Sequence, residues 1–150
     1  MTLVYDVPAT PLIQNLAGRL SQEPAIKRPE WAQFAKTGVH REKAPRDANW
    51  WNVRLAAVLR KVYAEGPIGA ERLRAAYGGP RDRGAAPNRA KSGSGSVARE
   101  ALQQLEAAGL VEPVKGQGRR VTAKGRKLCD AAAHEVAGKL VETIPGLAKY

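Results

Sequence analysis

The stretch from Tyr77 to Leu128 constrains the fold more than any other part of the chain. It begins with a basic loop rich in glycine and serine over 78–95, and then continues into an amphipathic helix with apolar residues at helical spacing. Gly109 ends this helix, and two short strands joined by the sequence VKGQG lead to Thr122, a residue type that caps helices. This order of elements predicts a recognition-type helix plus wing over 97–122, the core of a winged-helix-like unit.

Helical periodicity dominates the remainder of the chain. Apolar residues recur at helical spacing, between prolines and glycines, in the segments 12–20, 29–36, 47–65, 68–76 and 123–141. Candidate N-caps are Asp47 or Asn49, Ser94 or Ser96, and Thr122. Ile68 is also placed to form a single strand rung against the hairpin. We predict a mainly α fold, a helical bundle around the winged-helix-like core, in one domain over 1–150 with an extended arm at 1–11 and a tail at 145–150.

The charge balance limits the partners of the chain. Its 150 residues carry 25 lysines and arginines against 14 acidic residues, a formal net charge of +11 with an isoelectric point near 10.2. Such an excess favours nucleic acid or an anionic membrane as partner, but no apolar run is long enough to span a bilayer. The single cysteine, Cys129, excludes an internal disulfide, and the N-terminus lacks the order of a secretory signal, so we expect a cytoplasmic protein.

No constellation of residues in the sequence supports catalysis. His40 and His134 fall in different predicted elements, and neither has a metal-ligand spacing from Cys129. The glycine runs lack the preceding strand, the following helix and the Lys-Ser/Thr ending of a phosphate-binding loop. We therefore expect no enzymatic activity, no cofactor, no metal and no small-molecule substrate.

Several basic segments are candidates for contact with nucleic acid. One face of the 47–65 helix carries Trp50, Arg54 and Lys61, so that an aromatic ring can stack on a base or ribose while the cations neutralise phosphates. The same spacing also fits Trp50 in the core and Arg54 as a solvated charge, and periodicity does not choose between them. We expect the 78–95 loop to order only on its partner. The predicted contact residues are Lys36, Arg41, Lys43, Trp50, Arg54, Arg60, Lys61, Arg81, Arg83, Arg89, Lys91, Arg99, Lys115, Arg119 and Arg120.

The segment PNRAKSGSGSVAREALQQLEAAGLVE, from Pro87 to Glu112, resembles the signature of the nineteen-e ribosomal protein family of archaeal and eukaryotic small subunits. The family pattern reads V-x-R-x-x-L-Q-x-L-E along the helix. Further collinear matches extend the resemblance over essentially the whole chain. They are PEW at 29–31, NWW-x-x-R at 49–54, RKVY at 60–63, YGG at 77–79 and G-R-x-V-T-x-x-G-R at 118–126. The start YDVP and the tail IPGLAKY are similar to archaeal members.

The resemblance implies a ribosomal role. It implies a helical domain around a winged-helix-like core, located in the head of the small subunit and bound to the 3′ major domain of its rRNA beside neighbouring head proteins. In the eukaryotic members it also implies a part in subunit maturation, and we expect this chain to aid small-subunit assembly or maturation. We also expect the chain to be monomeric when free. Trp50, Arg54, Arg60 and Arg99 match positions that the family uses for RNA contact or assembly. One departure is Glu100, where many eukaryotic members carry a second basic residue, so a phosphate contact is not expected there.

A winged-helix transcription regulator that binds duplex DNA is the alternative, and it is the commonest use of such a unit. Two features oppose it: no further helix is available for dimerisation, and the basic residues are spread over several segments. Arg99 is the only strong cation on the outer face of the recognition-type helix. The 78–95 loop and the face with Trp50 and Arg54 are therefore better candidates for RNA contact than that helix.

Overall fold

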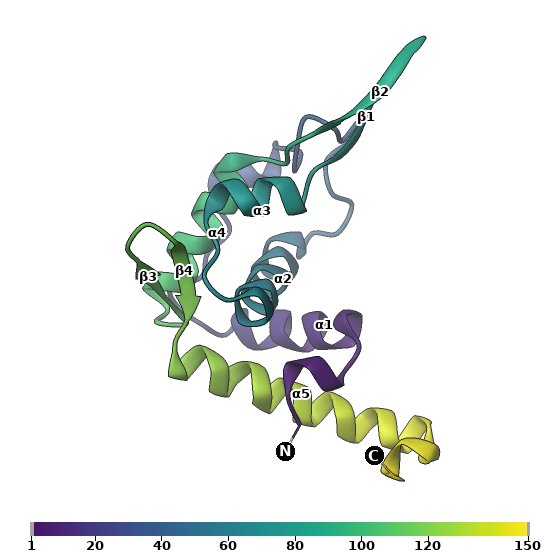
Figure 1. The fold of residues 1–150 in the computed structure, drawn as a ribbon, viewed down its shortest axis with the longest axis vertical. Coiled ribbons are helices and arrows are strands. Elements are labelled where there is room, and N and C mark those ends of the chain that lie inside the picture. The colour runs from purple at the N-terminus through teal and green to yellow at the C-terminus, as the bar shows by residue number, and fades with distance from the viewer. Residues whose placement is uncertain (1, 150) are drawn as a thin grey trace.

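The computed structural model describes residues 2–149. Within this range, five α-helices and two two-stranded antiparallel sheets make the fold mainly α, as predicted (Figure 1). The helices are α1 (Ala9–Leu20), α2 (Trp50–Glu65), α3 (Ala70–Ala76), α4 (Gly95–Ala107) and α5 (Ala123–Thr143). The strands are β1 (Gly79–Arg83), β2 (Ala86–Lys91), β3 (Val111–Val114) and β4 (Gly118–Val121). Short 3-10 helices occupy Val4–Asp6, Glu30–Gln33 and Pro145–Lys149.

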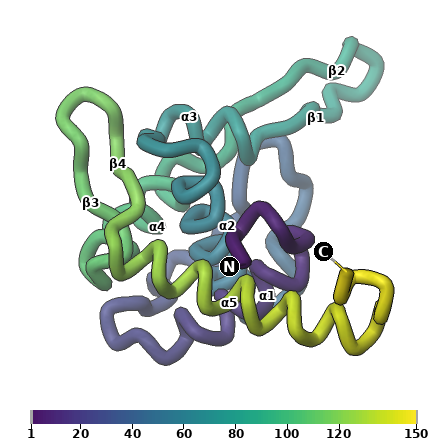
Figure 2. The backbone as a smooth tube through the Cα atoms, turned by 60° about the horizontal axis from the view of Figure 1, so that its bottom comes forward, coloured from purple at the N-terminus to yellow at the C-terminus, as the bar shows by residue number. Residues whose placement is uncertain are grey.

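A single apolar core lies around α2. The stripe of Trp51, Leu55 and Leu59 on α2 is buried, and it belongs to one cluster with apolar side chains of α1, α4 and α5. Figure 2 shows α5 running alongside α1, so these two helices close the core on one side. Each fully buried leucine side chain contributes about 1.5–3 kcal/mol relative to exposure, so this cluster supplies most of the stability. Cys129 is part of the cluster, and its burial raises the pKa of the thiol to about 12.

The second half of the chain follows the predicted order. Ser94 accepts a hydrogen bond from the N–H of Val97 at 3.3 Å and caps α4, and Thr122 accepts one from the N–H of Gly125 at 3.1 Å and caps α5. The cap predicted at Asp47 or Asn49 differs: Asn49 is the N-cap of α2, but its side chain makes no capping hydrogen bond.

The predicted strand rung at Ile68 is confirmed. Ile68 and Arg119 exchange two backbone hydrogen bonds, each 3.0 Å long, so Ile68 adds a rung to the edge of the β3–β4 hairpin. The helix predicted over 68–76 therefore begins at Ala70. Gly118 lies beside this rung with a φ of +95°, and a Cβ there would press on the backbone of Ile68.

The segment 78–95 is the main correction to the sequence prediction. It is not an irregular loop, because β1 and β2 pair as an antiparallel hairpin that projects from the body (Figure 1). Glycines at its base let the two chains run unusually close: a Cβ on Gly93 would lie 3.0 Å from the carbonyl oxygen of Tyr77, and one on Gly78 would press on the carbonyl oxygen of Lys91.

The N-terminal segments also differ from the prediction. The arm expected over 1–11 contains a 3-10 turn and the first residues of α1, and its side chains Val4 and Val7 are buried in the core. The helix expected over 29–36 is limited to a 3-10 turn at Glu30–Gln33, and the tail forms a 3-10 turn as well. Burial of apolar side chains, which local periodicity does not show, holds the arm against the body.

A buried hydrogen-bond chain joins α2 to α4. The indole N–H of Trp51 donates to Oε1 of Gln104 at 3.1 Å, and Nε2 of Gln104 donates to the carbonyl oxygen of Lys27 at 2.7 Å. Gln104 is one of two buried polar side chains within residues 2–149. These hydrogen bonds therefore satisfy donors and acceptors that the core has removed from water.

Replacement of Gln104 by leucine is expected to lower the free energy of unfolding by about 1–3 kcal/mol, because the indole N–H of Trp51 and the carbonyl of Lys27 lose their partner inside the core. The matched control is Gln103→Leu, one position earlier on the exposed side of α4, which should change stability by less than about 0.5 kcal/mol. Urea unfolding followed by tryptophan fluorescence measures both. Equal stability of the two variants would contradict the assignment.

No helix within residues 2–149 combines the length and the apolar character that crossing a membrane requires. In the same range, no three His, Cys, Asp or Glu side chains lie close enough together to hold a metal ion.

Candidate nucleic-acid interface

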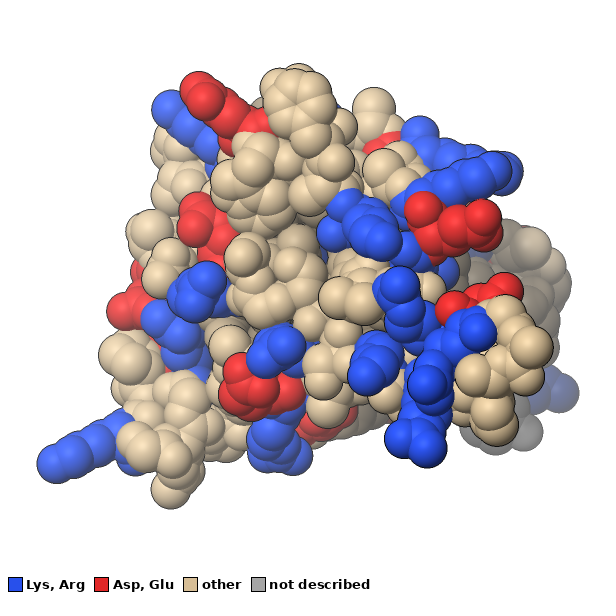
Figure 3. Space-filling view, turned by 90° about the horizontal axis from the view of Figure 1, so that it is seen from above, with Lys and Arg blue, Asp and Glu red and all other residues tan. Residues whose placement is uncertain are grey.

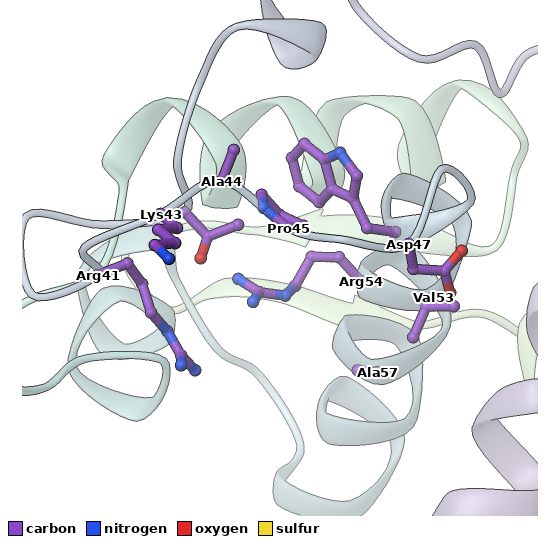
Figure 4. Close-up of a pocket in the computed structure, with 10 residues that line it drawn as sticks. Arg41, Lys43, Ala44, Pro45, Asp47, Val53, Arg54 and Ala57 are labelled. Carbon is purple, nitrogen blue, oxygen red and sulfur yellow. The ribbon is translucent and has the colours of Figure 1, made fainter.

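A groove lies where the segment 37–47 passes over the first turns of α2 (Figure 4). We call it the α2 groove, and its volume is about 350 Å³. It is lined by Thr37, Arg41, Lys43, Ala44, Pro45, Asp47, Trp50, Val53, Arg54 and Ala57. Figure 4 shows Arg54 reaching from α2 toward Arg41 and Lys43. Asp47 lies at the opposite end, beside Val53, so the two ends of the groove differ in charge.

Arg54 is the fixed cation of the α2 groove. Its guanidinium carbon lies 4.3 Å from the centre of the Tyr77 ring, a cation–π arrangement that holds the side chain in place. Burial lowers the pKa of Arg54, the nearby Tyr77 raises it, and the charge of Arg41 lowers it further. Arginine keeps its proton in spite of such shifts, and no ion pair compensates Arg54 within residues 2–149. A bound anion would relieve both the lost hydration and the repulsion from Arg41.

Trp50 combines the two roles that the sequence left open. Its ring packs edge-on against Trp51, with the centroids 5.5 Å apart and the planes at 85°, and it borders the core. The side chain is nevertheless only half-buried and lines the α2 groove. Trp50 is therefore an aromatic wall of the groove that the core holds in place, and Arg54 is not a freely solvated charge.

Three of the predicted contact residues have carboxylate partners inside the protein. Lys61 pairs with Glu65 at 2.9 Å along α2, Arg119 pairs with Glu106 at 2.6 Å, and Arg120 pairs with Glu112 at 2.6 Å. The last two pairs neutralise Arg119 and Arg120, so Lys115 is the one predicted basic residue of the wing that has no carboxylate partner among the described residues. The pairing makes the wing and Lys61 weaker candidates for phosphate contact than their positive charge suggested.

The other predicted cations form no ion pair within the described part of the chain. They are Lys36, Arg41, Lys43, Arg54, Arg60, Arg81, Arg83, Arg89, Lys91, Arg99 and Lys115. Figure 3 looks down on the hairpin end of the molecule and shows lysine and arginine side chains concentrated on the side of the β1–β2 hairpin. Arg99 on α4 and Lys115 at the wing tip are both exposed. Arg60 is half-buried, and its Nε has no hydrogen-bond partner.

One side of the β1–β2 hairpin carries three cations. Arg81 lies directly opposite Arg89, and Lys91 opposite Gly79, so these three cations share one side of the two-stranded sheet. Arg83 follows a bulge in the register and donates a hydrogen bond to the carbonyl oxygen of Pro87 at 3.4 Å. Like charges directly opposite one another destabilise a hairpin. A polyanion laid along this face would remove that repulsion.

The base of the hairpin is fastened to the wall of the α2 groove. The N–H of Ser94 donates to the carbonyl oxygen of Thr37 at 3.0 Å, and Gly38 forms an antiparallel bridge with Gly93. The guanidinium of Arg81 donates to the carbonyl oxygen of Val39. The hairpin and the groove are thus joined through one short segment, and their cations form one surface, which we call the cationic face.

The sequence did not reveal how Tyr77 and Asp47 contribute to this surface. Tyr77 supports the guanidinium of Arg54 from the end of α3, and Asp47 borders the groove ahead of α2. Tyr77 lies in the YGG motif, which is the only local signal for it. Its contact with Arg54 joins two different helical segments, and helical spacing within one segment carries no information about such a contact.

The fold and the cationic face define a class: a small, basic, mainly helical protein with a group of unpaired cations around the α2 groove and the β1–β2 hairpin. Within that class, the family model for ribosomal protein S19e matches residues 3–139. The chain is 47% identical to small ribosomal subunit protein eS19 of Aeropyrum pernix, over 100% of this chain and 99% of that protein. It is 43% identical to eS19 of Haloarcula marismortui with the same coverage. It is 40% identical to eS19G of Ascaris suum, over 90% of this chain and 92% of that protein.

The chain therefore belongs to the ribosomal protein S19e family. It is a ribosomal protein of the eS19 kind, a component of the ribosome in the cytoplasm, and not an enzyme. The resemblance seen in the sequence motifs, including the likeness to archaeal members, is confirmed.

Proposed function

We propose that the chain is a structural constituent of the small subunit, that it binds small-subunit rRNA in the 3′ major domain of the head, and that it aids subunit assembly. The observation that carries this proposal is the cationic face, where Arg41, Lys43, Arg54, Arg81 and Arg89 gather without carboxylate partners among the described residues. The small-subunit names of the relatives support the same assignment.

Binding would rest on phosphate neutralisation by a preformed surface. Each cation that contacts a phosphate releases counterions, so affinity depends strongly on salt. The fixed geometry of the hairpin and groove supplies shape recognition, because folded RNA is recognised mainly by its shape, its backbone and its unstacked bases. Neighbouring head proteins as further partners, and a monomeric free state, stay predictions.

A winged-helix-like core is part of the proposal. The succession α3, α4, β3 and β4, with Ile68 as an additional rung, supports that arrangement. The DNA-regulator alternative is not favoured, because Arg119 and Arg120 of the wing are paired with acids, and Arg99 is the one strong cation on the outer face of α4. In this protein the unit would serve as a scaffold for the cationic face.

The test compares two RNA transcripts of equal length, one from the 3′ major domain and one from another domain of the same rRNA. Filter binding with the purified full chain should show a preference for the 3′ major domain. The affinity should also fall by about 100-fold or more between about 50 and about 200 mM salt. Equal affinity for the two transcripts, together with a flat salt dependence, would exclude this function.

A further inference from the structure

The α2 groove has the dimensions of a ligand site. Its volume of about 350 Å³ falls at the lower end of the range that small-molecule and cofactor sites occupy. A duplex rests on a broad surface and places no group in such a hollow, whereas an unstacked nucleotide can enter it. The size therefore points to one nucleotide and not to a helical segment of RNA.

The cationic end of the groove suits a phosphate. Arg54 is held over Tyr77 at 4.3 Å and reaches toward Arg41 and Lys43 (Figure 4). The fixed position of Arg54 lowers the entropic cost of binding an anion, and a phosphate accepts charge-assisted hydrogen bonds from guanidinium groups.

The other part of the groove suits a base. Trp50 lines the groove and is held edge-on against Trp51 at 5.5 Å, so its ring is a rigid platform. Aromatic side chains of this kind stack on unstacked bases of any sequence. Asp47 lies at the end of the groove away from Arg41, and its Oδ1 accepts the N–H of Asn49 at 2.9 Å, which fixes the carboxylate. A carboxylate repels a phosphate, and it accepts hydrogen bonds from the amino group of a base.

The groove is formed before any ligand arrives. The N–H of Trp50 donates to the carbonyl oxygen of Asp47 at 3.2 Å, which closes one end of the 37–47 segment. The bond from Ser94 to Thr37 and the bridge between Gly38 and Gly93 hold the other end. A site of this kind does not have to be ordered by its ligand, unlike a flexible basic loop.

We propose that the α2 groove binds a single unstacked nucleotide of the RNA, with its base on Trp50 and its phosphate at Arg41, Lys43 and Arg54. This inference rests on the proposed function and makes it more specific. RNA bound by this protein therefore has a single-stranded position, such as a bulge or a loop, beside α2.

The test measures binding of the full chain to a short single-stranded oligoribonucleotide and to a duplex with the same number of phosphates. Trp50→Leu should weaken binding of the single strand by about 5- to 100-fold and change duplex binding by less than about 2-fold. The matched control is Trp31→Leu. Trp31 also packs edge-on against Trp51, at 5.9 Å, but lies outside the groove. The Trp31→Leu variant should bind both RNAs with the affinity of the unmodified chain.

A second measurement needs no substitution. The unmodified chain is irradiated with an oligoribonucleotide that carries 5-bromouracil, and the crosslinked residue is identified by mass spectrometry. A crosslink to Trp50 is expected. Crosslinks that all fall outside the groove, or unchanged single-strand binding by folded Trp50→Leu, would overturn the nucleotide site while leaving rRNA binding intact. Failure of the unmodified chain to bind any RNA would instead overturn the proposed function, and the nucleotide site with it.

Discussion

Replacement of Arg54 by glutamate is expected to lower the affinity for small-subunit rRNA by about 10- to 100-fold, the equivalent of one lost charge-assisted hydrogen bond. The substitution removes the cation that Tyr77 holds in the α2 groove and puts a carboxylate in its place. The slope of log affinity against log salt should become shallower by about one phosphate contact. Filter binding over a series of salt concentrations measures both effects, and incorporation of the variant into small subunits should fall in parallel.

The control for this prediction makes the same charge change elsewhere. Lys127 is exposed on α5, which Figure 1 places at the opposite end of the molecule from the β1–β2 hairpin. Lys127→Glu should leave the affinity and the salt slope close to those of the unmodified chain. Circular dichroism confirms that both variants are folded. If a folded Arg54→Glu protein binds and incorporates normally, the α2 groove is not part of the rRNA contact.

Replacement of Gly125 by alanine is expected to lower the free energy of unfolding by about 1–3 kcal/mol, although alanine is normally the better helix former. Gly125 lies in the first turn of α5, where a Cβ would press on the carbonyl oxygen of Leu110. It would also lie 2.8 Å from Cγ2 of Val121. The approach of helix α5 to the start of β3 is therefore possible only without a side chain.

Gly138 supplies the matched control on the same helix. A Cβ there meets no atom within 4 Å, so Gly138→Ala should raise stability by about 0.5–1 kcal/mol through helix propensity alone. Chemical denaturation of the two variants measures both effects. Opposite signs are the predicted result, and a Gly125→Ala variant as stable as Gly138→Ala would show that α5 does not pack closely on Leu110.

Local signals in the sequence located the five α-helices and the wing, but they also predicted a helix over 29–36, where the structure has only a 3-10 turn at Glu30–Gln33. The caps at Ser94 and Thr122 and the end of α4 at Gly109 depend on neighbouring residues. The rung at Ile68 pairs with Arg119 far along the chain, and it was expected from the winged-helix-like arrangement and not from a local pattern. Strands β1 and β2 gave no such signal. Every residue of β2 is exposed, so the hairpin lacks the apolar alternation that marks a half-buried strand. Its glycines, which are typical of loops, are needed for the close approach of the chains at its base.

The candidate site was only partly predictable for a related reason. The positive charges were visible in the sequence, but their partners were not, because Arg119 meets Glu106 across two elements and Arg54 meets Tyr77 across two helical segments. Tertiary contacts therefore divided the predicted cations into paired ones, such as Arg119 and Arg120, and unpaired ones on the cationic face. From charge alone, all these residues are equal candidates for phosphate contact. The fold separates them, because only some of them have carboxylate partners.

The most direct test of the rRNA-binding assignment is sedimentation of the tagged chain through a sucrose gradient of ribosomal subunits. The chain is predicted to travel with the small subunit, to stay bound through a moderate salt wash and to be released at high salt, because many phosphate contacts act together. A chain that sediments apart from the small subunit at low salt, or that leaves it in the mildest wash, would contradict the account.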